Sequence, residues 1–180
     1  MKRTRRFSPL ILMCALLLSS PGSANDTIER SGDALSIILP LCAAAATAYH
    51  HDGEGALQFA EAFATTMGVT YALKYSIDKR RPDGSGQDSF PSGHTAAAFS
   101  GASFLQQRYG TSYGLPAYLA AVYVGWSRVE VKAHAVEDVL AGAAIGVIGT
   151  YLFTKKFNRE ISFLPVVGKK QYGLVFQKKF

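Results

Sequence analysis

Apolar residues gather in five segments of the chain, and polar stretches containing glycine or proline separate them. Residues 55–77 show the spacing most clearly, because Phe59, Phe63 and Met67 recur close to a helical period. The other four segments are rich in alanine and other apolar residues and have lengths typical of helices. The pattern predicts an all-α protein, a compact bundle of helices over residues 34–49, 55–77, 91–106, 115–126 and 136–153.

The stretches outside these helices differ in composition. Residues 25–32 are polar and are expected to be a lead-in. Residues 50–53 contain two adjacent histidines, but no further His or Cys lies nearby, so a solvated turn is favoured over a metal site. Residues 163–167 and 172–176 look extended, which predicts a short C-terminal β-hairpin. The expected division is therefore a signal peptide (1–24), a helical domain (25–158) and a C-terminal tail containing the hairpin (159–180).

The N-terminus has the pattern of a secretory signal, with a basic start and an apolar run from Leu10 to Leu18. The small residues Gly22, Ser23 and Ala24 follow and predict cleavage after Ala24. An uncleaved membrane anchor is the alternative, but the apolar run is shorter than the ~20 residues that a span needs. The segment predicts export to the periplasm or cell envelope.

The formal charge of +6 comes mainly from this segment. Residues 1–24 hold four of the 19 basic residues and none of the 13 acids, so the remaining 15 basic residues leave a net charge of +2. That balance is too mild to indicate a nucleic-acid partner. The other segments are apolar but diluted by Ala and Gly, so a bundle touching the membrane and one spanning it both fit, and membrane association is expected.

Candidate chemistry lies between Lys74 and Asp138. Lys74 and Arg81 stand seven residues apart near the end of a predicted helix, and Pro82 follows. Lys is a point charge and Arg a bidentate fork, a pair suited to phosphate oxygens if both face one pocket. Lys79 and Arg80 beside them are equally consistent with a solvated basic patch.

The second stretch is Pro-Ser-Gly-His at residues 91–94. A Ser-Gly pair that opens a helix directs backbone N–H groups at an anion, and the Ser92 hydroxyl adds a donor beside the Gly93 N–H. His94 then lies one turn inside the helix and can exchange a proton near neutral pH. A capped helix start with an incidental histidine is the alternative.

The third stretch supplies Arg128, a further permanent cation, and the pair His134 and Asp138. On a helix, residues four apart share a face. A carboxylate bonded to one ring nitrogen would fix the tautomer and leave the other nitrogen as a nucleophile. Such pairs are as often structural as catalytic. Together, however, the three stretches indicate a phosphate-handling site.

The three stretches match the pattern K-x6-R-P, P-S-G-H and S-R-x5-H-x3-D at every defining position. The chain thereby resembles the type 2 phosphatidic acid phosphatase superfamily, which includes bacterial acid phosphatases and vanadium-dependent haloperoxidases. The resemblance extends to about Phe153. It implies a helical bundle of that kind and a phosphatase that needs no metal or other cofactor, because the cations stabilise the charge.

The resemblance also implies roles for the residues. His134 would attack phosphorus and form a phosphohistidine, oriented by Asp138, and His94 would protonate the leaving oxygen. The phosphoryl oxygens would be held by a further set, Lys74, Arg81, Ser92, Gly93 and Arg128.

The expected function is hydrolysis of phosphate monoesters or pyrophosphates. Lipid phosphates are favoured as substrates because the helices are apolar and rich in Ala and Gly. Three alternatives remain open at this point. They are a periplasmic acid phosphatase acting on soluble esters, a vanadate-dependent haloperoxidase and a non-catalytic phosphate-binding protein of the envelope.

Overall fold

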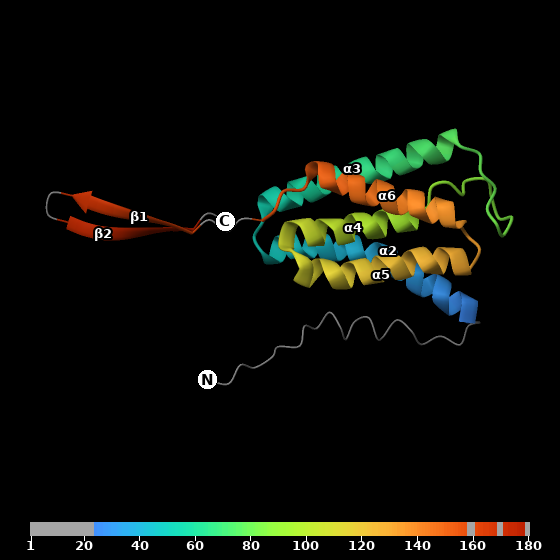
Figure 1. The fold of residues 1–180 in the computed structure, drawn as a ribbon, viewed down its shortest axis with the longest axis horizontal. Helices are drawn as coiled ribbons and strands as arrows, with labels where there is room; N and C mark the ends of the chain where they lie inside the picture. The colour runs from blue at the N-terminus through green and yellow to red at the C-terminus, as the bar shows by residue number, and fades with distance from the viewer. Residues whose placement is uncertain (1–23, 158–160, 169–170, 179–180) are drawn as a thin grey trace.

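The computed structural model describes residues 24–157, 161–168 and 171–178 (Figure 1). The expected signal peptide, apart from Ala24, lies outside the described residues and stays a prediction. Within these described residues, five helices form one bundle, which confirms the all-α expectation. They are α2 (Ala24–Tyr49), α3 (Gly53–Ser76), α4 (Gly93–Tyr109), α5 (Thr111–Glu130) and α6 (Val136–Phe153).

The start of α2 differs from the sequence expectation. The polar residues 25–32, predicted to be a lead-in, form the first two turns of this helix. They do so because their polar and small side chains dock on α5: Ser31 Oγ lies 2.7 Å from Tyr123 Oη, and Gly32 is buried. Polarity here therefore serves contact with a neighbouring helix.

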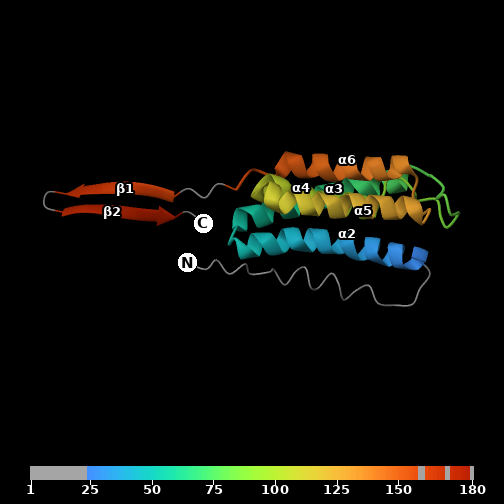
Figure 2. The ribbon, with the colours of Figure 1, turned by 60° about the horizontal axis from the view of Figure 1, so that its bottom comes forward.

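Helix α4 lies at the centre, and α2, α3, α5 and α6 all pack on it (Figures 1 and 2). Its side chains are small enough for neighbours on every side, since Ala96, Ala98 and Ala102 are completely buried. Phe104 fills the space toward α3, where its ring centroid lies 4.9 Å from that of Phe59 in a tilted contact. The helix starts after Ser92 and ends at Gly110, whose φ of 89° allows the chain to reverse directly into α5.

The glycines of α6 permit its close approach to α4 and α3. A Cβ at Gly142 would overlap the Ser92 carbonyl oxygen, and one at Gly146 would lie 2.5 Å from the Ala96 carbonyl oxygen. Gly149 faces the Thr66 hydroxyl in the same way. Because the first two contacts are with backbone, they set how closely α6 packs on α4.

The turn between α2 and α3 was expected to be solvated, and this is wrong for Asp52, which is buried. Its carboxylate caps α3 by accepting from Gly55 N at 2.9 Å and pairs with Arg108 Nη2 at 2.6 Å. Arg108 also donates to the Lys155 carbonyl at 2.9 Å. This buried pair joins three chain segments at one end of the bundle.

Strands β1 (Ile161–Gly168) and β2 (Gln171–Lys178) pair in antiparallel register and confirm the expected hairpin. In both views the hairpin extends beyond one end of the bundle, away from the loop that joins α3 to α4 (Figures 1 and 2).

Many large apolar side chains on the outer helices face outward. Helices α2 and α6 are long and apolar enough to cross a membrane. Large exposed apolar residues occur on all four outer helices, among them Ile37, Leu41, Leu57, Tyr75, Leu119, Trp126, Leu140 and Leu152. A surface of this kind is typical of contact with lipid.

We predict that Gly146→Ala destabilises the bundle by about 1–3 kcal/mol, because the added methyl group meets backbone atoms that cannot move aside. Gly68→Ala on α3 is the matched control, since a Cβ there meets nothing within 4 Å. That variant should gain about 0.5–1 kcal/mol from helix propensity. Denaturant unfolding in mild detergent measures both. Equal midpoints for the two variants would contradict the packing account.

Candidate active site

The site residues expected from the sequence gather at one end of the bundle, where α3 and α5 end and α4 and α6 begin (Figure 1). Helix α2 also begins at this end, so five helix ends of the described residues meet there because consecutive helices run in opposite directions. Lys74 lies in the last turn of α3 and His94 in the first turn of α4. Arg128 lies in the last turn of α5, and His134 precedes α6.

The loop 77–92, which joins α3 to α4, folds back on itself at this end. Lys79 N donates to the Gln87 carbonyl at 3.0 Å, and Ser89 N donates to the Lys79 carbonyl at 2.9 Å. The loop is also tied to the turn between α5 and α6, because Asp83 N donates to the Lys132 carbonyl at 3.1 Å. These hydrogen bonds hold the loop backbone in place and so position the side chains of the loop.

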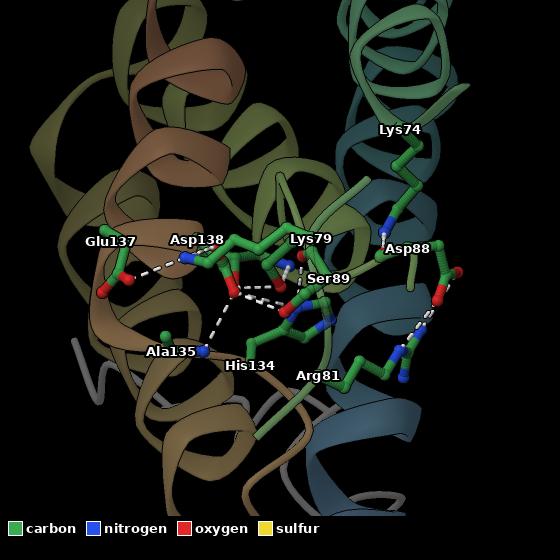
Figure 3. A network of polar contacts seen from close by, with 11 residues as sticks. Lys74, Lys79, Arg81, Asp88, Ser89, His134, Ala135, Glu137 and Asp138 are labelled. Carbon is green, nitrogen blue, oxygen red and sulfur yellow. Dashed lines mark hydrogen bonds and ion pairs between the residues drawn. The ribbon is translucent and has the colours of Figure 1, made fainter. Parts of the chain in front are cut away.

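Lys74 and Arg81 meet at Asp88 (Figure 3). Lys74 Nζ donates to the Asp88 carbonyl at 2.6 Å, and Arg81 donates to the Asp88 carboxylate at 2.9 and 3.2 Å. Helix α3 ends at Ser76, before Arg81, and this lets the two cations point to the same place. The Arg81 hydrogen bond lowers the pKa of Asp88. Sequence reasoning missed Asp88, which lies in a loop without periodicity.

Ser92 and Gly93 start α4 as expected, but the Ser92 hydroxyl is engaged in the helix cap. It lies 3.0 Å from Thr95 Oγ1 and accepts from Thr95 N at 3.5 Å. Ser92 N donates to the Asp138 carbonyl at 2.9 Å, which joins the start of α4 to α6. The Lys74 side chain passes over Gly93, where an added Cβ would lie 3.7 Å from Lys74 Cε. Lys74 is thus beside the N-terminus of α4.

His134 is held by a backbone carbonyl rather than by Asp138. Its Nδ1 donates to the Ser89 carbonyl at 2.7 Å, whereas Asp138 Oδ2 lies 3.8 Å from the same nitrogen. A carbonyl oxygen only accepts, so the neutral ring carries its proton on Nδ1 and its lone pair on Nε2. The expected helical pair is therefore corrected: His134 stands before α6, while Asp138 is inside it.

Asp138 is fully buried and binds the groups that surround His134 (Figure 3). Its carboxylate accepts from Ser89 Oγ at 2.5 Å, from Lys79 Nζ at 2.6 Å and from Ala135 N at 3.0 Å. Oδ2, the Asp138 oxygen 3.8 Å from the imidazole, already accepts two of these bonds, and the Nδ1 proton of His134 goes to the Ser89 carbonyl instead. Asp138 acts on His134 indirectly, by holding the loop that carries the Ser89 carbonyl.

Lys79 belongs to this network, against the alternative of a solvated patch. It bridges the buried Asp138 and the exposed Glu137, at 2.6 and 2.7 Å. Burial opposes its charge, but the hydrogen bonds to the two carboxylates raise the pKa of Lys79. The sequence does not distinguish Lys79 from the exposed Arg80 beside it. A loop has no regular repeat, so the sequence does not show which of its side chains point inward.

A third group of contacts involves Asp33 of α2, which the sequence did not single out. Its Oδ1 lies 2.6 Å from Arg128 Nη1 and 3.2 Å from His94 Nε2. The Arg128 side chain is 3% exposed, whereas that of His94 is 46% exposed. The first turns of α2 thus form part of the site.

Burial and charge set the protonation of the two histidines. Burial lowers the pKa of His134 to about 4, and Lys74 and Arg81 act in the same direction. His134 is therefore neutral near pH 7, the state in which an imidazole nitrogen keeps its lone pair. Burial and Arg128 also lower the pKa of His94, while the Asp33 carboxylate opposes them.

The sequence model of the PAP2 superfamily matches residues 55–162 of this chain. This match covers more than half of the chain and includes every site residue of the three stretches. The chain belongs to the PAP2 superfamily.

Two curated relatives are lipid A phosphatases. The chain is 30% identical to lipid A 4'-phosphatase of Helicobacter pylori over 94% of both proteins. It is 36% identical to lipid A 1-phosphatase of Porphyromonas gingivalis over 59% of its own length but spans only a quarter of that enzyme. Family membership and these relatives together support phosphatase activity.

Two crystal structures share the fold. LpxE of Aquifex aeolicus aligns with a TM-score of 0.61 and 21% identity over 84% of this chain and 98% of that one. A transmembrane PAP2-type phosphatidylglycerolphosphate phosphatase of Bacillus subtilis aligns with a TM-score of 0.54 and 23% identity over 80% of this chain and 90% of that one. At these identities the likeness shows the shared fold, and helices α2 and α6 agree with membrane association by their length and composition.

We predict that Lys79→Met destabilises the protein by about 1–3 kcal/mol, because it leaves the buried Asp138 carboxylate without its cation while two neutral donors remain. The figure is below that for a fully buried pair because the Lys79 side chain is 30% exposed. Unfolding in detergent measures the change.

Arg80→Met is the matched control, because it removes the neighbouring charge from an exposed position. Its unfolding midpoint should stay close to that of the wild type. If Lys79→Met were no less stable than Arg80→Met, Lys79 would not be the partner that holds Asp138.

Proposed function

We propose that this protein is a phosphatase of the cell envelope that removes phosphate from lipids through a phosphohistidine on His134. The observation that carries the proposal is the state of His134: it is buried, neutral near pH 7 and bonded through Nδ1 to a carbonyl, and Lys74 and Arg81 help to lower its pKa. Such a ring offers Nε2 to an electrophilic phosphorus and is kept from protonation.

The reaction would proceed in two displacements. The lone pair of His134 Nε2 attacks phosphorus, and the bond from phosphorus to the ester oxygen breaks as His94 gives that oxygen a proton. Water then attacks the phosphohistidine and gives a proton to His94 while the nitrogen–phosphorus bond breaks. Inorganic phosphate and the free alcohol are the products, and both histidines return to their starting states.

The charge of the phosphoryl group would be matched by side chains from three elements. Lys74 comes from α3, Arg81 from the loop 77–92 and Arg128 from α5. The N-terminus of α4 adds Gly93, while Ser92 contributes by starting the helix. Because these groups are held in place by other contacts, little reorganisation is needed as charge spreads in the transition state.

Exposed apolar side chains beside the site support a lipid substrate. Tyr75 follows Lys74 and is 89% exposed, Trp126 lies two residues before Arg128 and is 47% exposed, and Val136 lies two residues after His134 and is 55% exposed. Acyl chains could contact these residues while the phosphate reaches the cations. The lipid A phosphatases among the relatives make a lipid A phosphate ester the first substrate to test.

His134→Asn should lower kcat by more than about a thousandfold on every phosphate substrate, because the nucleophile is lost. Initial rates in detergent and circular dichroism of the variant measure activity and folding. A folded variant with normal activity would exclude His134 as nucleophile.

In the wild type, kcat/KM should rise as the pH passes about 4, where His134 loses its proton.

His94→Asn should act according to the leaving group. An alkyl phosphate has a poor leaving group that needs a proton, so its hydrolysis should slow by roughly 10²–10⁴-fold. An aryl phosphate with an acidic phenol should lose far less. Comparison of kcat for the two esters tests this, and an equal loss on both would remove His94 from the role of acid.

Purified protein should hydrolyse lipid phosphates in detergent more efficiently than soluble phosphate esters. The comparison uses kcat/KM for lipid A, phosphatidic acid and a short-chain soluble ester, with His134→Asn as the blank. Hydrolysis of the soluble ester with every lipid phosphate left untouched would show that the lipid preference is wrong and favour the soluble-ester alternative.

A further inference from the structure

Asp33 stands in the site without belonging to any of the three sequence stretches. It comes from α2, some 40 residues before Lys74, and its Oδ1 contacts both Arg128 and His94. One carboxylate oxygen thus joins the buried cation expected to hold phosphate and the histidine expected to act as acid.

Three neighbouring contacts fix the position of Asp33. Ser31 Oγ lies 2.7 Å from Tyr123 Oη of α5. Gly32 lies against α5 so closely that an added Cβ would be 2.6 Å from Arg128 Nη2. Arg128 Nη2 also donates to the Glu29 carbonyl at 2.7 Å, one turn earlier on α2. The first turns of α2 are therefore docked on α5, and the carboxylate is held where it is.

The charges facing His94 come from four elements. Lys74 of α3, Arg81 of the loop 77–92 and Arg128 of α5 all disfavour a second proton on its ring, and burial does the same. Asp33 of α2 acts in the opposite sense. An acid catalyst in such cationic surroundings needs a nearby negative charge to stay protonated.

We propose that Asp33 is a positioning residue of this site. Its carboxylate orients the Arg128 guanidinium and accepts a hydrogen bond from the Nε2–H group of His94, which favours the charged ring and leaves the Nδ1 proton to be delivered to the leaving oxygen. The proposal rests on the proposed phosphatase function and adds a residue from α2 to it. The Asp33 side chain is 44% exposed, so it is accessible from the face at which substrate would enter.

The test compares Asp33→Asn with wild type, Asp33→Glu and a control, Asp26→Asn. Asparagine has the shape of aspartate and its amide oxygen can still accept a hydrogen bond from Nε2–H, so folding and ring orientation should survive while the charge is lost. Asp26 is exposed and lies seven residues earlier on α2, so its variant removes the same charge from the same helix. Circular dichroism confirms folding of each variant.

Two readouts separate positioning from a purely structural role. The first is the pH profile of kcat/KM, whose descending limb follows loss of the His94 proton. In Asp33→Asn this limb should move to lower pH, with activity at pH 7–8 down by roughly tenfold, less than for loss of the acid itself. Asp33→Glu should recover most of the loss, and Asp26→Asn should match the wild type.

The second readout is ¹⁵N NMR of histidine-labelled protein, with the His94 signal assigned through His94→Asn. The His94 titration should move to lower pH in Asp33→Asn, and the neutral wild-type ring should carry its proton on Nε2. The proposal would be overturned if neither the His94 titration nor the descending limb of kcat/KM moved in Asp33→Asn. It would also be overturned if the neutral wild-type His94 ring carried its proton on Nδ1 alone. The NMR titration needs no turnover. A wild-type protein inactive on all phosphates would therefore refute the proposed function, while the titration would still test the contact between Asp33 and His94.

Discussion

The buried carboxylate of Asp138 is the interaction on which the site depends. It accepts from Ser89 and Lys79 of the loop 77–92 and from the backbone of Ala135, so it joins that loop to the start of α6. A fully buried carboxylate without such donors would cost several kcal/mol. The loop therefore has to close over Asp138, and its closure brings the Ser89 carbonyl to His134. The Ser89 carbonyl therefore orients His134, and the Asp138 carboxylate holds the loop that carries this carbonyl.

This arrangement separates two tasks that a direct Asp–His pair would combine. The carbonyl of Ser89 selects the tautomer of His134 without placing a full negative charge beside it, and burial together with Lys74 and Arg81 keeps the ring neutral. The negative charge of Asp138 is instead balanced by Lys79. Arg81 pairs with Asp88 and Arg128 pairs with Asp33, so the cations of the site are already oriented by carboxylates.

Much of the fold followed from the sequence, because apolar periodicity and glycine placement report packing directly. Helix α6 begins and ends where the pattern put it, and its glycines lie against α4 and α3. The start of α2 was missed because its polar residues contact another helix. In the sequence, such residues look the same as polar residues that face solvent. The three stretches also come together at one end of the bundle, as expected.

The supporting residues of the site could not be predicted in the same way. Lys79, Asp88 and Ser89 lie in a loop, where no period distinguishes inward from outward side chains. Their partners are far away in sequence, since Lys79 and Asp138 are 59 positions apart. Asp33 lies on a helix, but its role depends on the close contact of Gly32 with α5, which only the three-dimensional packing reveals.

The central claim is that the buried, neutral His134 forms the covalent intermediate. The most direct measurement is to mix enzyme with a lipid phosphate, quench within the first turnover in alkali, where phosphohistidine survives, and map the phosphorylated residue by mass spectrometry. Phosphate is expected on His134 in the wild type and should fall to background in His134→Asn. Phosphate found on a different side chain during turnover would contradict the claim.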